Sequence, residues 1–233
     1  AKQQTSWINP NEDYEADLAA FVEGVTTDPA TPGALAPLAA DLAEAGFANR
    51  LSQLTLKATA PGVPDVYRGT ELADLSLVDP DNRRPVDWDR RRDALDALAP
   101  LLDAPSPEAV RDLFDADTPD PRAYLYLTAR LLRWCRAHPD LAAAEGYTEL
   151  TPEGAGAGDW LAFLRYTGDA ALLTVVARHP LTRDADAAAA LPLPDGLAPR
   201  TWTDVLTGAS VEPGDALDLP ALPATRVATL HAS

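Results

Sequence analysis

The sequence has one cysteine, Cys135, and no methionine in 233 residues. A single cysteine excludes an intrachain disulfide framework and a zinc ribbon, and it is typical of proteins in a reducing cytoplasm. Basic residues are also scarce, with 19 against 36 acidic residues and a formal net charge of −17. This excess of negative charge argues against nucleic acid or an anionic membrane as a partner.

Long apolar runs are absent as well. No stretch reaches the about 20 apolar residues of a membrane span, and the N-terminus lacks the basic and apolar regions of a signal peptide. The sequence therefore predicts a cytoplasmic protein. It begins with Ala1-Lys2-Gln3-Gln4 and without Met, from which we expect a piece cut from a longer polypeptide.

The chain is nevertheless long enough for a substantial core. Its residues are 46% hydrophobic, and a chain of this length buries about 70–75% of its unfolded surface. At about 150 residues per domain, one large domain or two small ones are possible. The 22 prolines and 13 glycines predict many loops.

The first 140 or so residues carry mostly helical periodicity. Asn9 and Pro10 give a helix-start signal for a helix over 11–25, and two prolines and a glycine predict a loop over 26–33. One or two helices follow over 35–60, with Gly46 as the expected break. Further helices are expected at 88–103, 106–116 and 121–137.

From Tyr147 onward the apolar residues change to a period of two, which predicts strands. Short strands are expected at 147–151, 159–166, 171–178, 200–206, 209–212 and 225–231. The change predicts a boundary near 140–146, with a helical region over 1–142 and a small antiparallel β domain over 143–233. Together with one buried strand at 63–67, this makes the expected fold class α+β.

The most informative stretch joins that short strand to a polar loop over 69–88. The strand carries Tyr67 and Glu71 to its C-terminal end, where sites lie in parallel barrels. The loop reads DPDNRRPVD over 79–87, and its carboxylates, amide and guanidinium groups can hydrogen-bond a polyhydroxylated ligand from several sides. The same residues are ordinary turn formers and surface ion pairs, so a structural role for the loop is the alternative.

Residues 62–71, GVPDVYRGTE, resemble the strand-8 signature of the alpha-amylase superfamily, with Arg68 where glutamine is usual. Residues 79–87 resemble one family more specifically, the maltooligosyltrehalose synthase family. TSWINPNE at 5–12 and LTG at 206–208 resemble motifs of the same family. Over the whole chain, the resemblance implies the C-terminal end of a (β/α)8 barrel, with helices and the last strand, followed by a small antiparallel β-sandwich domain.

The same resemblance implies an activity. It is an isomerase of trehalose biosynthesis that converts the reducing-end α-1,4 bond of a maltooligosaccharide into an α,α-1,1 bond, with no metal or organic cofactor. The family's three catalytic carboxylate motifs are absent from this sequence, so they would lie upstream, and the chain alone is expected to be inactive. The implied partners are a maltooligosaccharide substrate and the missing N-terminal barrel portion.

The resemblance thus assigns this chain substrate contacts, without a catalytic residue and without a metal ligand. The expected substrate-binding residues are Tyr67, Glu71, Asp79, Asp81, Asn82, Arg83, Arg84 and Trp7.

Other functions remain open at this point. The chain could be a non-catalytic carbohydrate-binding or scaffold module, or part of another alpha-amylase superfamily hydrolase. Trp160 and Trp202 are expected in the core of the β domain rather than against a sugar. A barrel strand without neighbours would leave an apolar seam along 47–67, through which the chain could self-associate.

Overall fold

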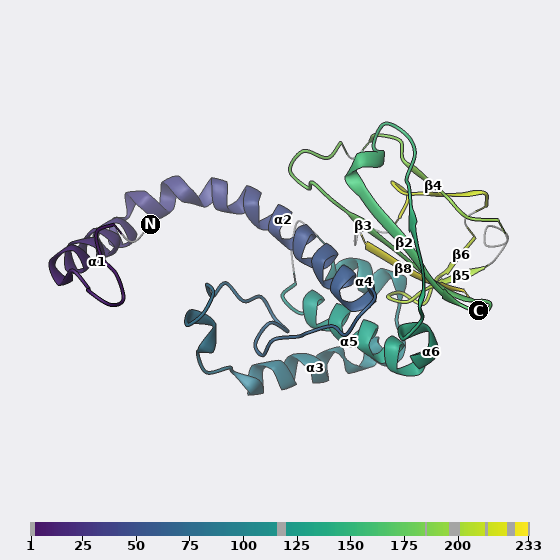
Figure 1. Ribbon diagram of the computed structural model, residues 1–233, viewed down its shortest axis with the longest axis horizontal. Helices are drawn as coiled ribbons and strands as arrows, with labels where there is room; N and C mark the ends of the chain where they lie inside the picture. The colour runs from purple at the N-terminus through teal and green to yellow at the C-terminus, as the bar shows by residue number, and fades with distance from the viewer. Residues whose placement is uncertain are drawn as a thin grey trace. The chain divides into compact units, whose positions relative to one another are not determined.

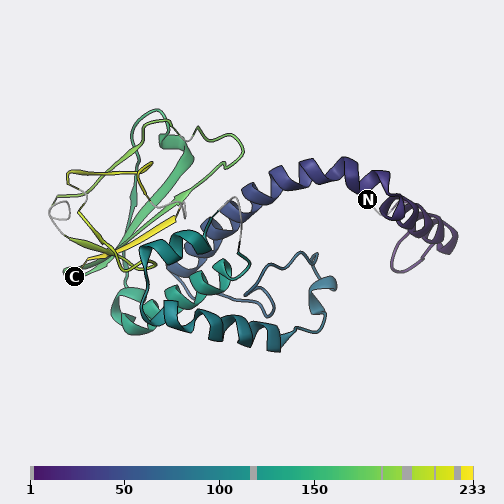
Figure 2. The same cartoon turned by 180° about the vertical axis from the view of Figure 1, so that it is seen from behind.

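The computed structural model describes residues 3–115, 120–184, 186–195, 201–212, 214–222 and 227–232. The chain divides into two compact units, Ala1–Ala43 and Glu44–Ser233. Figures 1 and 2 show the ribbon from opposite sides. Among the described helices, none combines the length and the apolar character needed to cross a bilayer.

Helix α1, Glu12–Thr27, makes up much of the first unit. The Asn11 side chain caps it by accepting a hydrogen bond from the backbone N–H of Tyr14 at 3.1 Å. Acidic residues occupy the first turn, where the helix dipole favours negative charge. No residue of α1 is buried, so its apolar side chains lie exposed in this unit.

Helix α2, Ala30–Thr59, runs from the first unit into the second, and two predictions about it are wrong. The expected loop over 26–33 is reduced to a short break, where the Asp28 carboxylate accepts a hydrogen bond from the backbone N–H of Ala30 at 2.9 Å. Pro32 is tolerated because the N–H groups of a first helical turn have no partner within the helix. Gly46 does not break the helix, because a mid-helix glycine costs only about 1 kcal/mol.

The remaining helices belong to the second unit. Predicted helices at 88–103, 106–116 and 121–137 are confirmed with small shifts of their ends, residue 116 lying outside the described residues. The short α6 was missed because a single turn has no periodicity to detect. These helices are α3 (Trp88–Asp103), α4 (Pro107–Leu113), α5 (Ala123–Ala137) and α6 (Pro139–Ala142), with 3-10 turns at Asp81–Arg83 and Ala157–Asp159.

The β part contains two antiparallel sheets. The larger has the strand order β1-β2-β3-β8-β5-β6, and the smaller pairs β4 with β7. All six predicted strands have counterparts, although residues 200 and 225–226 lie outside the described part. Strands β4 and β7 were missed because three residues are too few for an alternation. The strands are β1 (Gly146–Leu150), β2 (Trp160–Thr167), β3 (Ala170–Ala177), β4 (Ala190–Pro192), β5 (Trp202–Asp204), β6 (Ser210–Val211), β7 (Ala216–Asp218) and β8 (Val227–Ala232).

The central strands β3 and β8 of the larger sheet are buried on both faces. Leu172 and Val176 of β3 belong to the core formed with the helices, whereas Leu173 and Val175 belong to the core shared with β4 and β7. Helices α3 to α6 of the second unit accordingly lie on one side of this sheet in Figure 1. Trp202 is fully buried in the second core, as expected. The fold is therefore α+β with an antiparallel sheet, and helices and sheet share one core.

Residues 63–67 were expected to form a strand, and no strand is assigned there. A strand requires a neighbouring chain segment for its ladder hydrogen bonds, and this segment has none among the described residues. The expected apolar seam along 47–67 is also largely wrong. Phe47 and Leu51 of α2 are buried, and the Phe47 ring packs 5.3 Å from the ring of Tyr124 on α5. Only Val63 projects fully into solvent, at 96% exposed.

Candidate functional site

The candidate site begins with a tight turn at the end of segment 63–67, which has no assigned helix or strand. The backbone N–H and the hydroxyl of Thr70 both donate to the carbonyl of Tyr67, at 3.2 and 2.7 Å. Gly69 has a φ of +93°, a conformation that disfavours any side chain. A Cβ at this position would also approach Val86 to 3.3 Å. Glycine is therefore required where the segment turns into the polar loop.

Glu71 is part of an ion pair within the protein. Its Oε2 accepts from Arg91 Nε at 2.8 Å and from the backbone N–H of Gly69 at 3.0 Å. Arg91, on α3, also donates to the carbonyls of Gly69 at 2.5 Å and Asp87 at 3.0 Å. Both side chains of the pair are mostly buried. Glu71 therefore fixes the loop through Arg91.

A second arginine supports the same turn from α2. Arg50 donates to the carbonyls of Thr70, at 2.8 Å, and Leu72. Its guanidinium lies 3.8 Å above the ring of Tyr124, and burial lowers its pKa. Sequence reasoning missed Arg50 and Arg91. Their partners Thr70 and Glu71 lie 20 positions away in the sequence, so the local pattern carries no signal for either contact.

The tip of the loop is held by two local ion pairs across the 3-10 turn. Arg83 contacts Asp79 through both Nε and Nη2, the second at 2.9 Å, and Arg84 contacts Asp81. The side chain of Arg83 is 67% exposed and that of Arg84 76% exposed. Exposed pairs of this kind add about 0–1 kcal/mol to stability, so both arginines can exchange partners at little cost.

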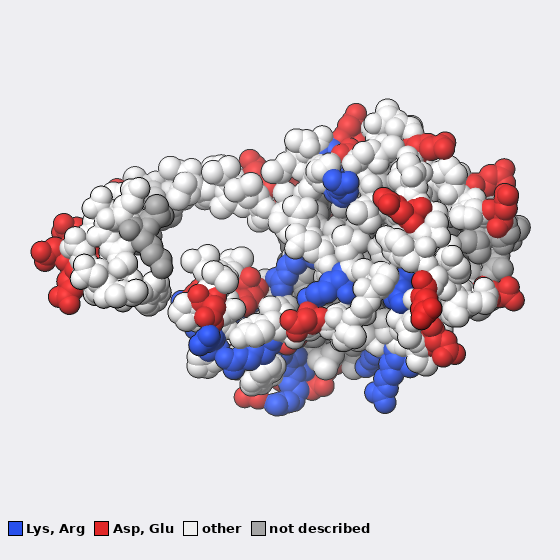
Figure 3. Space-filling view, in the orientation of Figure 1, with Lys and Arg blue, Asp and Glu red and all other residues white. Residues whose placement is uncertain are grey.

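The loop and the start of α3 enclose a polar pocket of about 440 Å³. Asn82 lines it, and its Oδ1 is buried with no hydrogen-bond partner among the described residues. Figure 3 shows basic side chains gathered over α3 and the preceding loop, interleaved with acidic ones. The charged and amide side chains at the pocket wall are Arg68, Asp74, Asp81, Asn82, Arg84, Asp87 and Arg91.

One carboxylate of this pocket, Asp74, has a lowered pKa. Asp74 accepts from the backbone N–H of Ser76 at 2.9 Å, and this bond lowers the pKa of its carboxyl group, with a smaller contribution from Arg50 and Arg91. Asp74 is therefore ionised at neutral pH. The wall offers donors from arginines and acceptors from carboxylates, which suits a neutral ligand with many hydroxyl groups.

The structure brings only part of the predicted set together. Asp81, Asn82 and Arg84 line the pocket. Tyr67 is 42% exposed and does not line the pocket. Glu71, Asp79 and Arg83 are engaged in the ion pairs described above. Trp7 belongs to the first unit, where it is 86% exposed. Arg68, which departs from the superfamily signature, lies in the wall and donates to the carbonyl of Arg83 at 3.1 Å.

The sequence of this chain was compared with known proteins. Curated proteins from two strains of Mycobacterium tuberculosis, each named as a maltooligosyl trehalose synthase, are 37% identical to it over 209 residues. The match covers 89% of this chain. The chain is a relative of part of maltooligosyl trehalose synthase. No family model matches it.

Solved structures agree with this relationship. The maltooligosyltrehalose synthase of Arthrobacter ramosus superimposes with a TM-score of 0.77 at 30% sequence identity, over 100% of this chain and 28% of that one. A second crystal structure titled maltooligosyl trehalose synthase gives a TM-score of 0.75 at 25% identity, over 100% of this chain and 28% of that one. The chain spans about a quarter of the length of the curated relatives it matches, 24%.

Proposed function

We propose that this chain is the C-terminal portion of a maltooligosyltrehalose synthase. The whole enzyme would convert the reducing-end α-1,4 bond of a maltooligosaccharide into an α,α-1,1 bond, which is a step of trehalose biosynthesis. The observation that carries the proposal is the 37% identity over 89% of the chain to curated proteins of that name. A cytoplasmic location goes with it, as the cysteine usage predicts.

The polar pocket of the 69–88 loop supports a role in holding a sugar. A retaining glycoside mechanism needs two carboxylates about 5–5.5 Å apart, one as nucleophile and one as acid and base. In this proposal the upstream portion supplies both. The loop would hold the released glucose while it turns its anomeric hydroxyl towards the glycosyl intermediate, and Arg84 and Asn82 are its best-placed donors and acceptors.

The detailed architecture belongs to the same proposal. Segment 63–67 would be the last strand of a (β/α)8 barrel, paired only when the rest of the barrel is present. The helical part over 1–142 and the sheets over 143–233, as a β-sandwich, would then be two domains that pack on each other through the shared core. In the isolated chain, the unpaired segment and the exposed apolar side chains of α1 would favour self-association.

A chimera tests the proposed function. In the Mycobacterium tuberculosis relative, the segment matched by this chain is replaced by this chain, and consumption of maltopentaose is measured. We expect the chimera to consume the sugar, whereas the isolated chain leaves it unchanged. A folded chimera without activity would contradict the proposal and favour a non-catalytic binding or scaffold module. A chimera that only hydrolyses would favour another hydrolase of the superfamily.

A further inference from the structure

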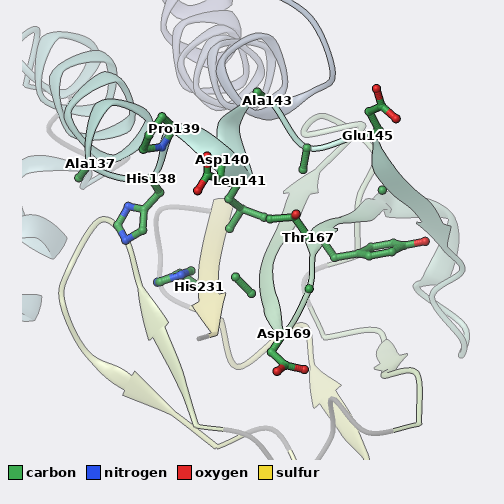
Figure 4. A pocket seen from close by; sticks show the side chains of 15 residues that line it. Ala137, His138, Pro139, Asp140, Leu141, Ala143, Glu145, Thr167, Asp169 and His231 are labelled. Carbon is green, nitrogen blue, oxygen red and sulfur yellow. The ribbon is translucent and has the colours of Figure 1, made fainter.

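A second pocket lies in the second unit, where the helices meet the larger sheet. It is lined by the end of α5, by α6, by the turn joining β2 to β3 and by β8. Its volume is about 890 Å³, within the range of sites for ligands of drug-like size. Figure 4 shows its side chains. The polar residues of its wall include His138, Asp140, Glu145, Tyr166 and His231. None of them was singled out as a binding residue from the sequence.

Two histidine rings, His138 and His231, line this pocket, and the ring of Trp134 packs against both. The ring of Trp134 stacks on that of His138, with centroids 4.6 Å apart and planes 18° apart. The His231 ring meets His138 at 4.6 Å and Trp134 at 5.5 Å, in edge-on geometry. The two imidazoles therefore have fixed orientations and lie next to each other, as Figure 4 shows.

The hydrogen-bonding character of the two imidazoles follows from their surroundings. His138 Nδ1 lies 3.0 Å from the carbonyl of Trp134, so Nδ1 donates and Nε2 of the neutral ring is an acceptor. Burial, with a smaller contribution from the neighbouring His138, lowers the pKa of His231. At neutral pH His231 is therefore uncharged, with one donor and one acceptor nitrogen.

The rest of the wall adds acceptors and one aromatic surface. The Tyr166 ring packs on Gly146, where a Cβ would lie 2.7 Å from ring carbons, and the residue remains 41% exposed. Asp140 and Glu145 are exposed carboxylates, each able to accept from two hydroxyls. No lysine or arginine lines the pocket, so an anionic ligand such as a phosphorylated sugar is disfavoured.

Two other ligand classes fit less well. Among the described residues, no group of three or more His, Cys, Asp or Glu side chains could hold a metal ion. An organic cation would gain little from Asp140 and Glu145, because exposed carboxylates are solvated and screened. Imidazoles, carboxylates and a tyrosine ring instead match the hydroxyl groups and the apolar faces of a neutral oligosaccharide.

We propose that the pocket formed by His138, His231, Asp140 and Tyr166 binds a neutral maltooligosaccharide, separately from the pocket of the 69–88 loop. The choice of glucan as the ligand rests on the proposed function. The site itself rests on the ring stack, the carboxylates and the absence of basic residues from the wall. In the longer enzyme it would hold a distant part of a long glucan chain and so favour long substrates.

Binding is tested on this chain without catalysis. Maltopentaose is titrated into the chain by calorimetry at neutral pH, and Asp140→Asn is compared with Asp96→Asn, an exposed acid on α3 outside the pocket. We expect millimolar binding that Asp140→Asn weakens by about two- to tenfold, since an exposed carboxylate contributes less to a hydrogen bond than a buried one. His231→Gln should weaken it as well, and Asp96→Asn should leave it unchanged.

Four results would overturn the site. The first is that no sugar binds at millimolar concentration, and the second is that Asp140→Asn and Asp96→Asn lower the affinity for maltopentaose equally. The third is that Arg84→Ala, in the other pocket, lowers this affinity. The fourth is that the chain binds spermidine and does not bind maltopentaose. Melting curves of each variant separate lost binding from lost folding. If the chimera is active but no sugar binds at this pocket, the proposed function is supported and only the proposal of this second site is contradicted.

Discussion

The Oε2 atom of Glu71 and the Nε atom of Arg91 lie 2.8 Å apart in an ion pair that is mostly shielded from solvent. The glutamate of the strand-8 signature is thereby held within the protein. Through Arg91 it is connected to the carbonyls of Gly69 and Asp87, at the two ends of the polar loop. The pair sets the shape of the loop on which any sugar contact depends.

Arg91→Ala should therefore destabilise the chain. We expect the free energy of unfolding to fall by about 2–3 kcal/mol, because a mostly buried ion pair, one partly buried hydrogen bond to the backbone and one exposed one are lost. Arg92→Ala is the matched control, since the neighbouring Arg92 pairs with Asp89 at the exposed surface. It should cost less than about 1 kcal/mol. Urea titration measures both, and equal losses would show that the Glu71–Arg91 pair does not hold the loop.

Arg165 should be equally important for joining the helices to the sheet. Its buried guanidinium donates to the carbonyls of Thr59 at 3.3 Å, Ala142 at 2.8 Å and Ala144 at 3.0 Å, near the C-terminal ends of α2 and α6. Such ends favour a cation. Arg165→Met should lower the free energy of unfolding by about 2–4 kcal/mol.

Arg165→Lys should recover little of that loss, because one ammonium group cannot reach three carbonyls on separate elements. Arg133→Met, which removes a half-exposed arginine paired with Asp103, serves as the control and should cost less than about 1 kcal/mol. Thermal melts are the readout. Full rescue by lysine would mean that charge alone, without the fork of the guanidinium, is what matters at this position.

The stability of the chain should depend on pH through Asp204. Desolvation by burial raises the pKa of this carboxyl group above 3.8, against the opposing hydrogen bonds from Thr207 and Leu206. The folded state therefore favours the protonated form. As pH rises from 3.8 through the folded pKa, ionisation costs stability, so the wild type should lose stability relative to Asp204→Asn.

Asp120 provides the control of opposite sign. The hydrogen bonds from Arg122 lower the pKa of its carboxyl group, so the stability it contributes is present above 3.8 and is lost as pH falls through the folded pKa. As pH rises, the free energy of unfolding of the wild type should therefore increase relative to that of Asp120→Asn. Urea titrations across this range measure both trends, and the same sign for the two variants would contradict the assignment.

In the chimera, Arg84 should affect the fate of the released glucose. Arg84 lines the loop pocket, whereas Arg83 is held by Asp79 outside its wall. Each hydrogen bond to a charged group contributes about 1.5–3 kcal/mol. Arg84→Ala should therefore shift the product ratio from transfer towards free glucose by about ten- to a hundredfold, while Arg83→Ala should shift it less. The reverse order would make Arg83 the sugar contact, and no shift in either variant would make the loop a scaffold.

Much of the fold could be predicted from the sequence because it follows local patterns. The helices from 88 to 137 and the longer strands have strong periodicity, and their caps, such as Asp87 before α3, are typical helix-start residues. The errors at 26–33 and Gly46 have one cause. Proline and glycine only bias the chain, and α2 continues because Phe47 and Leu51 pack on its buried face.

The candidate site was less predictable, because side-chain partners come from distant parts of the chain. Residue type and spacing identified the polar loop, but could not tell that Glu71 turns to Arg91, 20 positions later. In the same way, His138 and His231 meet only because β8 returns to the end of α5. Each histidine alone, at the end of an element, carries no binding signal in the sequence.

The product ratio of the chimera tests the central claim most directly. With maltopentaose as substrate, chromatography separates the α,α-1,1-linked product from free glucose. If this chain supplies the part of the enzyme that holds the released glucose, the chimera should form mostly the α,α-1,1-linked sugar. A chimera that cleaves the substrate but releases mainly glucose and shorter maltooligosaccharides would contradict the claim.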